Sequence, residues 1–324
     1  MSDAPDAVRR AWLGAVAAAV TGGGLAGCDP PAEPLRIGAQ VFPGYEMLFL
    51  ARQLGQLPEQ RVRLIEMPSA SASLRALASG ALECACLTLD EVLLARDRGV
   101  PLTVVLVLDV SMGADTVLAR PVVRDLADLR GRAIAVEQSA VGAVMLDAAL
   151  QAAGLRVTEV RPVHLPFDEH ERAYADRRVD AVVTYEPVTS RLRAAGAREL
   201  FSSREAPGLV LDVLAVRPPF LASHRLAIAT AVAAHLAARD RFVAAPSQYA
   251  AHLAPRLGLT PDQVPAAFSG LEMPDLARNR QLLTSPQGLR ASAERLAEVM
   301  RRAGLVEGGL EASGLVDAGF IGVS

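Results

Sequence analysis

The sequence contains no lysine, and its 324 residues include only three cysteines and 4% aromatic residues. All basic side chains are therefore arginine, and they form neither a long run nor an aromatic-flanked basic patch of the kind that binds nucleic acid. Nucleic acid is accordingly not expected as a partner. With 51% hydrophobic residues, 21% charged residues and a net charge of −3, the composition is that of a folded globular protein and not of a disordered chain.

Two of the cysteines, Cys84 and Cys86, lie two positions apart in the run GALECACLTL. On a strand both would point to the same face, an arrangement that does not suit a disulfide. No further cysteine or nearby histidine completes a set of metal ligands. We expect both to be small buried apolar residues, and we expect neither a metal nor a cofactor.

The third cysteine, Cys28, lies in a different context. A short positive region at Arg9 and Arg10 precedes the apolar stretch Trp12–Val20, which is too short to span a bilayer comfortably, and the tetrapeptide LAGC ends in this cysteine. The pattern resembles a bacterial lipobox, in which the chain is cut before a cysteine that carries a diacylglycerol. It predicts a lipoprotein signal over residues 1–27 and a lipid on the cysteine. A plain signal peptide or a membrane anchor is the alternative.

The residues after this cysteine extend the lipoprotein prediction. Asp29 resembles the signal that retains such lipoproteins at the inner membrane of some Gram-negative bacteria. Residues 28–34 contain three prolines and are expected to form a short stiff tether. The predicted location is therefore the periplasmic side of the inner membrane, where the lipid on Cys28 is the contact with the membrane.

Beyond the tether, short apolar runs alternate with helical patterns of about ten residues, which favours βαβ units and mostly parallel sheets flanked by helices. The length allows two domains or one large α/β domain. From residue 221 to residue 300 the pattern is helical. Strands are expected at residues 35–41, 62–67, 82–87, 102–108, 132–137, 157–165 and 181–184.

One stretch, Val104–Ala119, joins two β-type apolar runs through a polar insert at residues 109–115. It either leaves one sheet and enters another, or forms two ordinary buried strands joined by a turn. A second strand-like run, Leu209–Val216, is broken only by Asp212 and mirrors the first. Together they predict two crossings between lobes. Lobe 1 would comprise residues 35–112 plus 212–324, and lobe 2 residues 113–211.

Polar residues follow two strands of the predicted second lobe. Glu137 and Ser139 come after one strand, and Tyr185 and Glu186 come after another. Ligands of open α/β sheets bind outside the carboxyl ends of the strands, so these residues predict a polar cleft that faces the crossings. Ser139 either offers helix amides to a ligand or only caps its own helix.

Four segments follow one another in order: DVSMGAD at 109–115, AVEQS at 135–139, VDAVVTYEP at 179–187 and SREAPGLVLDV at 203–213. Their order and spacing resemble the substrate-binding proteins of ABC importers for nitrate, taurine and other sulfonates, a family that also includes binders of thiamine-precursor pyrimidines. The resemblance implies an α/β, two-lobed, type II periplasmic-binding-protein fold. It further implies a monomer that closes on a small ligand and delivers it to an ABC permease and ATPase complex.

Carried over by position, the resemblance places ligand contacts in both lobes. Family members often have Trp where this sequence has Tyr185, and Gly or Thr near Ala140 or Val141, so the resemblance does not fix the ligand. The predicted ligand-binding residues are Gly44, Tyr45, Ser69, Ser71, Thr88, Ser111, Gly113, Asp115, Ser139, Ala140, Tyr185, Glu186 and Asp212.

Charge gives one clue to the ligand. Five acidic residues are expected near the cleft, whereas the same motifs contain a single arginine, Arg204. The five are Asp109, Asp115, Glu137, Glu186 and Asp212. A bare anion such as nitrate is opposed by that field, and a zwitterion, a cation or a neutral heterocycle fits better. Alternatively, most of these carboxylates cap helices or fix the hinge. The expected ligand is a small polar molecule, sulfonate- or taurine-like or a related nitrogen or sulfur compound.

Other functions stay open at the level of sequence. A hydrolase needs a nucleophile, a base and an orienting acid, and the sequence contains no such triad, so we predict no catalytic residue and no enzyme. His164 and His170 are expected to be surface or packing residues. A ligand sensor for a membrane receptor, or a pyrimidine-precursor binder or enzyme of the same fold, would have the same two-lobed form.

Overall fold

The computed structural model of the chain describes residues 33–137, 140–308 and 312–322. By their contacts, residues 34–324 form one compact unit. The predicted signal over residues 1–27, the lipidation site Cys28 and the candidate Ser139 lie outside the described residues. In the part that is described, no helix combines the length and the apolar character needed to cross a membrane.

The described strands form two separate sheets, which we call sheet A and sheet B. Sheet A has the strand order β11-β4-β10-β3-β1-β2. Its strands are β1 (Leu35–Ala39), β2 (Val62–Glu66), β3 (Cys84–Thr88), β4 (Thr103–Ser111), β10 (Leu211–Val216) and β11 (Leu271–Glu272). Sheet B has the order β7-β6-β8-β5-β9. Its strands are β5 (Thr116–Ala119), β6 (Ala133–Val136), β7 (Arg161–His164), β8 (Ala181–Thr184) and β9 (Arg198–Ser202).

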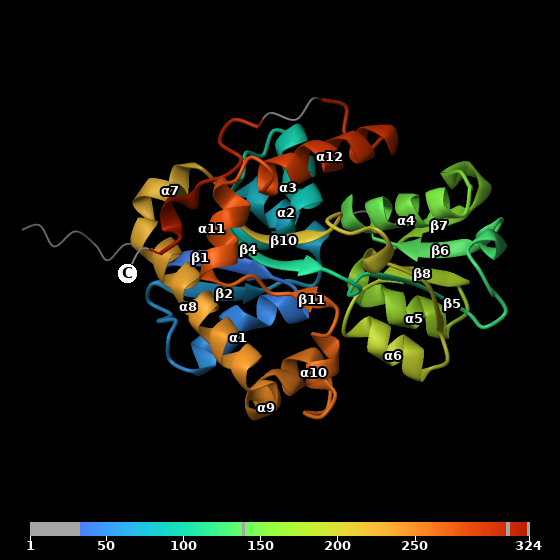
Figure 1. Cartoon of the computed structure of the whole chain (residues 1–324), viewed down its shortest axis with the longest axis horizontal. Helices are drawn as coiled ribbons and strands as arrows, with labels where there is room; N and C mark the ends of the chain where they lie inside the picture. Colours follow the sequence, from blue (N-terminus) through green and yellow to red (C-terminus); the bar gives the residue numbers. More distant parts are fainter. Residues whose placement is uncertain (1–32, 138–139, 309–311, 323–324) are drawn as a thin grey trace, which may run out of the picture. The chain divides into compact units, whose positions relative to one another are not determined.

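Helices cover both faces of each sheet. Those of the first half are η1 (Pro43–Tyr45), α1 (Glu46–Gln53), α2 (Ala70–Ser79), α3 (Leu89–Asp97), α4 (Ala140–Ala152), α5 (His170–Ala175) and α6 (Val188–Ala194). Those of the second half are α7 (Pro219–Ser223), α8 (Arg225–Ala244), α9 (Pro246–Leu257), α10 (Val264–Ala267), α11 (Leu276–Thr284) and α12 (Leu289–Arg302). Helices α2, α3 and α12 lie on one face of sheet A and α1 and α8 on the other, while α4 lies opposite α5 and α6 on sheet B (Figure 1).

Most strands of each sheet run in one direction, as the sequence predicted, but both sheets are mixed. Strand β1 is parallel to β2 and β3, and β6 is parallel to β7 and β8. In contrast, β10 is antiparallel to β3 and β4, and β5 is antiparallel to β8 and β9. The reason is that β5 and β10 each arrive from the other sheet. They enter at the edge where the parallel strands end, so they run in the opposite direction.

The structure contains the two predicted crossings. The chain passes from β4 in sheet A to β5 in sheet B and returns from β9 to β10 (Figure 1). Strand β4 continues to Ser111, so the polar insert between the sheets is shorter than expected and spans residues 112–115. The sequence pattern missed β9, because this edge strand begins with the exposed residues Arg198 and Glu199 and buries only its end. It also missed the short strand β11 within the region expected to be helical.

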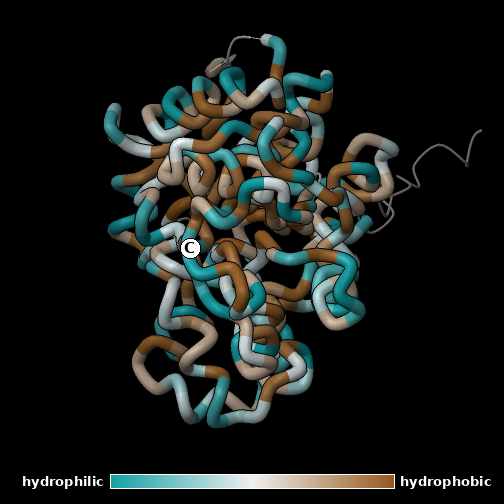
Figure 2. The backbone as a smooth tube through the Cα atoms, turned by 90° about the vertical axis from the view of Figure 1, so that its right-hand side faces the viewer, coloured by the Kyte–Doolittle hydropathy of each residue, from teal (hydrophilic) through white to brown (hydrophobic). Residues whose placement is uncertain are grey.

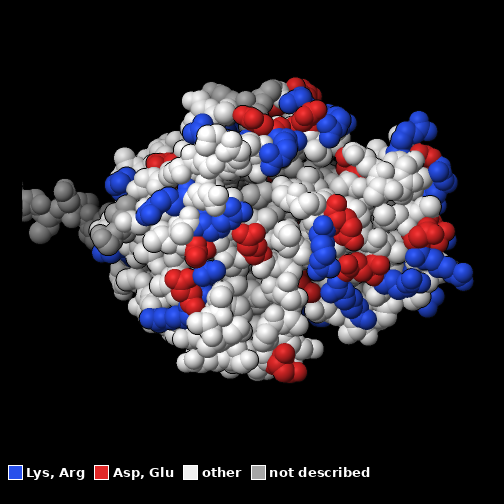
Figure 3. Space-filling model, in the orientation of Figure 1, with Lys and Arg blue, Asp and Glu red and all other residues white. Residues whose placement is uncertain are grey.

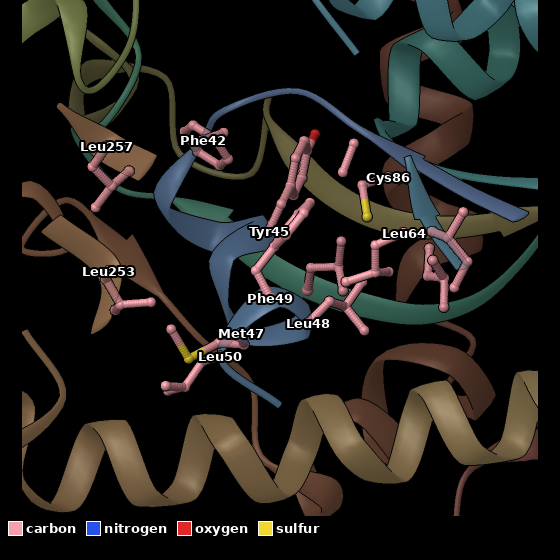
Figure 4. Close-up of a cluster of buried hydrophobic side chains, with 14 of the residues drawn as sticks. Phe42, Tyr45, Met47, Leu48, Phe49, Leu50, Leu64, Cys86, Leu253 and Leu257 are labelled. Atoms are coloured by element: carbon pink, nitrogen blue, oxygen red, sulfur yellow. The ribbon is translucent and has the colours of Figure 1, made fainter. Parts of the chain in front are cut away.

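The core consists of apolar side chains packed between the sheets and their helices. Figure 2 shows hydrophobic segments mainly inside the molecule and hydrophilic segments at its bends. Cys84 and Cys86 are free and fully buried, as the alternation in β3 predicted. Around helix α1, Met47 and Leu50 point toward α8, whereas Tyr45 extends toward Cys86 and strand β10 (Figure 4). Each such buried side chain contributes about 1.5–3 kcal/mol of apolar transfer free energy.

Candidate functional site

Six carboxyl groups lie buried where the two sheets meet, and we call them the acidic cluster. They are Asp90, Glu91, Asp109, Asp115, Glu137 and Asp212, and none of them is more than 5% exposed. Asp90 and Glu91 lie in the first turn of α3, Asp109 lies on β4 and Asp212 lies on β10. Asp115 directly precedes β5, and Glu137 directly follows β6. Electrostatic interactions connect them: Asp90 with Asp115, Glu91 with Glu137, and Asp212 with both Asp109 and Asp115.

Asp109 and Asp212 are directly paired across the antiparallel strands β4 and β10. The hydroxyl group of Tyr45 donates a hydrogen bond to Asp212. Burial raises the pKa of Asp109 to about 8 and raises the pKa of Asp212 well above its usual range, and the neighbouring carboxylate acts in the same direction on Asp212. Because two adjacent carboxylates do not both ionise away from water, at least one of the two carboxyl groups keeps its proton at neutral pH.

The backbone of η1 packs directly against this pair. A Cβ atom at Gly44 would lie 1.7 Å from Oδ2 of Asp109, so only glycine allows this approach. The neighbouring ring of Phe42 meets Tyr45 edge-on at a centroid distance of 5.1 Å. The sequence segment PGY therefore brings a hydroxyl donor and a bare backbone onto the two aspartates.

Tyr185 extends the site from the end of β8. Its ring stacks on Phe167 at 4.1 Å and meets the ring of Phe42, beside sheet A, at 5.4 Å. Its hydroxyl group is buried without a hydrogen-bond partner among the described residues, and its electrostatic neighbours are Glu137 and Glu91. The cavity beside Tyr185 is lined by residues of the sheet B side and holds about 10 Å³, about enough for one water molecule and too little for a larger solute.

Hydrogen bonds connect the two sides at separate places. Ser71, in the first turn of α2, donates its backbone N–H (3.2 Å) and its hydroxyl group (3.0 Å) to Oε1 of Glu137. At the crossings, the hydroxyl groups of Ser111 and Ser203 lie 2.6 Å apart. The N–H of Gly113 donates to Oγ of Ser203 at 2.7 Å, and the N–H of Asp115 donates to Oγ of Ser111 at 3.2 Å.

Several predicted site residues are occupied by local structure. Ser69 caps α2 by accepting from the N–H of Ala72 at 3.3 Å. Both carboxylate oxygens of Glu186 accept from Ser190, at 3.0 Å from its hydroxyl group and 3.1 Å from its N–H, so Glu186 caps α6, and the charged groups that act on it are Arg191 and Arg193. Gly113 has φ of 119°, and a Cβ there would lie 2.6 Å from the guanidinium of Arg204, which makes it a turn residue.

The other predicted residues divide between the site and its supports. Thr88 lies opposite Asp212 in the register of β3 and β10, and its N–H donates to Oε2 of Glu91 at 2.9 Å. Ala140 begins α4 directly after the undescribed residues 138–139. The structure therefore gathers eight of the predicted residues around or beside the acidic cluster: Gly44, Tyr45, Ser71, Thr88, Ser111, Asp115, Tyr185 and Asp212.

The acidic cluster is rich in hydrogen-bond acceptors and poor in donors. Oxygens without a partner among the described residues are both of Asp90, both of Asp109, Oε1 of Glu91, Oδ2 of Asp115 and Oε2 of Glu137. Burial raises the pKa of Asp90 to about 7 and that of Asp115 to about 6. In the described part of the chain no arginine forms an ion pair with the cluster, and no group of three or more His, Cys, Asp or Glu is placed to hold a metal ion.

Sequence reasoning missed several residues of this site. Asp90 and Glu91 directly follow β3, the same signal that pointed to Tyr185 at the end of β8, so this rule applied to sheet A would have found them. Asp109 was noted only as a carboxylate near the cleft, and its partner became visible only through strand register. His170 is a buried packing residue, whose Nε2 lies 3.2 Å from the carbonyl oxygen of Leu165.

Two mixed sheets flanked by helices, joined by two crossings and closed over a polar site, define a periplasmic-binding-protein fold. The fold is similar to that of the alkanesulfonate-binding protein SsuA from Xanthomonas axonopodis pv. citri bound to MOPS, with a TM-score of 0.75 and 20% identity, covering 89% of this chain and 99% of that chain. It is also similar to the periplasmic aliphatic sulphonate binding protein SsuA from Escherichia coli, with a TM-score of 0.69 and 20% identity, covering 86% and 95% of the two chains.

The chain belongs to the NMT1/THI5 like family, whose model matches residues 48–249. A curated relative from Escherichia coli (strain K12), provisionally named an aliphatic sulfonates-binding protein, is 27% identical over 191 residues. That match covers 57% of this chain and 60% of the relative, so it spans less than two thirds of the relative's length. The family resemblance and fold class expected from the sequence are confirmed.

Proposed function

We propose that this chain is the solute-binding component of an ABC importer, which captures a small polar molecule between its two lobes on the periplasmic side of the membrane. The carrying observation is the polar site buried between two sheets, beside a cavity of about 10 Å³. A binding protein needs such a site that opens and closes around its solute. The lobes would comprise residues 35–112 plus 212–324 and residues 113–211.

The relatives support this function. The named proteins of similar fold bind alkanesulfonates or aliphatic sulfonates, and the sequence relative carries a name of the same kind. Sulfonate- or taurine-like compounds are therefore the first solutes to test. The monomer would deliver its solute to a permease and ATPase complex, and the intermixed acidic and basic side chains of the face in Figure 3 offer no extended surface of one sign to a nucleic acid.

Binding rather than catalysis fits the reactive groups that the structure describes. Cys84 and Cys86 are fully buried, and burial raises the pKa of both thiols well above the usual range, which opposes a thiolate nucleophile. His170 is buried, and burial lowers its pKa to about 4, while its Nε2 lies beside a backbone carbonyl. These groups therefore do not form a nucleophile and base pair.

We further propose that the lipid on Cys28 holds the protein at the inner membrane, with residues 28–34 as a tether. Metabolic labelling with palmitate tests this: the wild-type chain should incorporate label, and the Cys28→Ala variant should not. Cys84→Ala is the matched control and should be labelled like the wild type. Label that survives Cys28→Ala would contradict the lipid anchor without affecting the binding function.

The binding function is tested by thermal unfolding and small-angle X-ray scattering with a panel of sulfonates, amines, pyrimidines and nitrate. A solute at 100 times its Kd should add about 2.7 kcal/mol to the unfolding free energy and make the particle more compact. No response to any class would contradict the proposal, and turnover of a compound would favour an enzyme. Loss of solute uptake on deleting the gene would separate an importer from a ligand sensor.

A further inference from the structure

We propose that the solute of this site is an organic cation with several N–H donors, such as a protonated amine or a guanidinium, and not a sulfonate. This inference rests on the proposed function, because it names the class of solute that the same site would bind. The carrying observation is that buried, unpartnered acceptor oxygens from four elements face the place where the two sheets meet.

The first reason is the excess of acceptors. Both carboxylate oxygens of Asp109 lack a hydrogen-bond partner among the described residues. One oxygen each of Glu91, Asp115 and Glu137 lacks one as well. A buried acceptor that loses water without gaining a donor costs free energy, so a fold keeps such groups where a ligand satisfies them. A solute that supplies several N–H groups matches this set. The oxygens of a sulfonate supply none.

The second reason is independent of the carboxylates. Tyr185 is 8% exposed, yet its hydroxyl group has no hydrogen-bond partner among the described residues. Tyr185 lines one cavity together with Asp115 and Glu137, and the charges that act on its hydroxyl group are those of Glu137, Glu91 and Asp115. A buried hydroxyl group without a partner, beside a cavity that acceptor residues also line, indicates that a ligand supplies the missing hydrogen bond.

The third reason is the sign of the electrostatic field that the acidic cluster produces. Among the described residues no ion pair joins an arginine to the acidic cluster: Arg256 binds Glu46 and Glu66, and the exposed Arg204 packs against Gly113 at the crossings. A cation that enters displaces the protons that burial keeps on these carboxyl groups, whereas a sulfonate would meet the field of the cluster without a paired guanidinium to offset it. A cation gains from the same field, and the rings of Phe42 and Tyr185 add a favourable surface for a cation.

The test uses the purified full chain and a polar small-molecule extract of a bacterial culture. Ion exchange at pH 7 divides the extract into cationic, anionic and neutral fractions, and each is added with EDTA to remove divalent metals. We expect the cationic fraction to raise the midpoint of thermal unfolding by about 5 °C, and the other fractions to leave it unchanged.

Two variants separate a binding role from a structural one. Asp109→Asn and Tyr185→Phe should each lose most of the shift produced by the cationic fraction. Without solute, neither variant should unfold at a lower temperature than the wild type, because an asparagine at position 109 can still donate to Asp212 and Tyr185→Phe removes a hydroxyl group without a partner among the described residues. Glu186→Gln is the matched control: it changes a carboxylate that caps α6, so the shift should persist.

The outcomes distinguish this inference from the proposed function. A shift with the anionic or the neutral fraction alone would overturn the cation assignment and leave a solute-binding protein. A shift that occurs only without EDTA would identify a metal ion and would also overturn it. If no fraction changes either the midpoint or the scattering profile, the proposed function itself is wrong and the cation assignment falls with it.

Discussion

The hydroxyl groups of Ser111 and Ser203 lie 2.6 Å apart, at the place where the strand that leaves sheet A passes the segment that returns from sheet B. Both serines are fully buried. The N–H of Gly113 and the N–H of Asp115 donate to the two hydroxyl oxygens. This small network joins both crossings at one point, so the two sheets turn about a common place next to the acidic cluster.

Removing one of these hydroxyl groups should therefore destabilise the whole unit. Ser203→Ala leaves the N–H of Gly113 and the hydroxyl group of Ser111 without their buried partner, which should cost about 1–3 kcal/mol in urea denaturation. Ser79→Ala is the control, because the hydroxyl group of Ser79 lies on the surface and donates to the carbonyl oxygen of Ala76 at 3.1 Å. Equal stability of the two variants would show that the network does not fix the crossings.

The unliganded protein should lose stability as the pH rises from about 6 to about 8, above the range in which the buried His170 and His235 act in the opposite direction. Burial raises the pKa of Asp109 to about 8, of Asp90 to about 7 and of Asp115 to about 6, whereas unfolded aspartates titrate near 4. Between the unfolded and folded values the folded state binds more protons, so the unfolding free energy falls with pH. Besides burial, the groups that act on Asp109 and its partner Asp212 are Asp115 and, through its hydrogen bond to Asp212, Tyr45.

Thermal unfolding at pH 5, 6, 7 and 8 measures this effect. Asp109→Asn should flatten the profile above pH 6 and raise the unfolding free energy at pH 8, because the variant lacks a buried group that must lose its proton there. The exposed Glu294→Gln should follow the wild-type profile. A wild-type midpoint that rises steadily from pH 5 to pH 8 would be the opposite of this prediction.

Replacing Gly44 should disturb the pair of aspartates. In Gly44→Ala the new Cβ would lie 1.7 Å from Oδ2 of Asp109, so η1 or the carboxyl group must move, at a cost of about 1–3 kcal/mol. The double variant Gly44→Ala with Asp109→Ala removes the clash. In a double-mutant cycle, the double variant should lose less unfolding free energy than the two single variants lose together. Strict additivity of the two losses would argue against the contact.

Among the ion-pair residues on the side of sheet A where α1 lies, Arg256 should be the one whose replacement costs the most stability. Its Nε donates to Oε1 of the buried Glu46 at 2.8 Å, and its guanidinium lies 3.4 Å from the ring centroid of Phe49. Arg256→Ala leaves a buried carboxyl group unpaired and should cost about 3–5 kcal/mol in chemical denaturation. Arg278→Ala breaks an exposed pair with Glu272 and should cost under about 1 kcal/mol. Similar losses would mean that burial of the pair is not decisive.

The sequence by itself determined the local elements and the family. The apolar runs at Thr116–Ala119 and Ala181–Thr184 predicted β5 and β8 with their bounds, because flanking polar residues end each run. Ser69 directly precedes α2, and a serine side chain at this position caps the free amides of the helix. The two broken apolar runs predicted the crossings. These features depend on residues that are close together along the chain.

Only the tertiary structure decided which carboxylates meet. Asp109 faces Asp212 because the register of β4 and β10 places them side by side, and Glu137 meets Ser71 because the sheets close on each other. Glu186, which the sequence assigned to the ligand, caps its own helix instead. Local pattern shows where a polar residue stands on its element. Its charge partners depend on contacts between distant segments, and those contacts exist only in the folded chain.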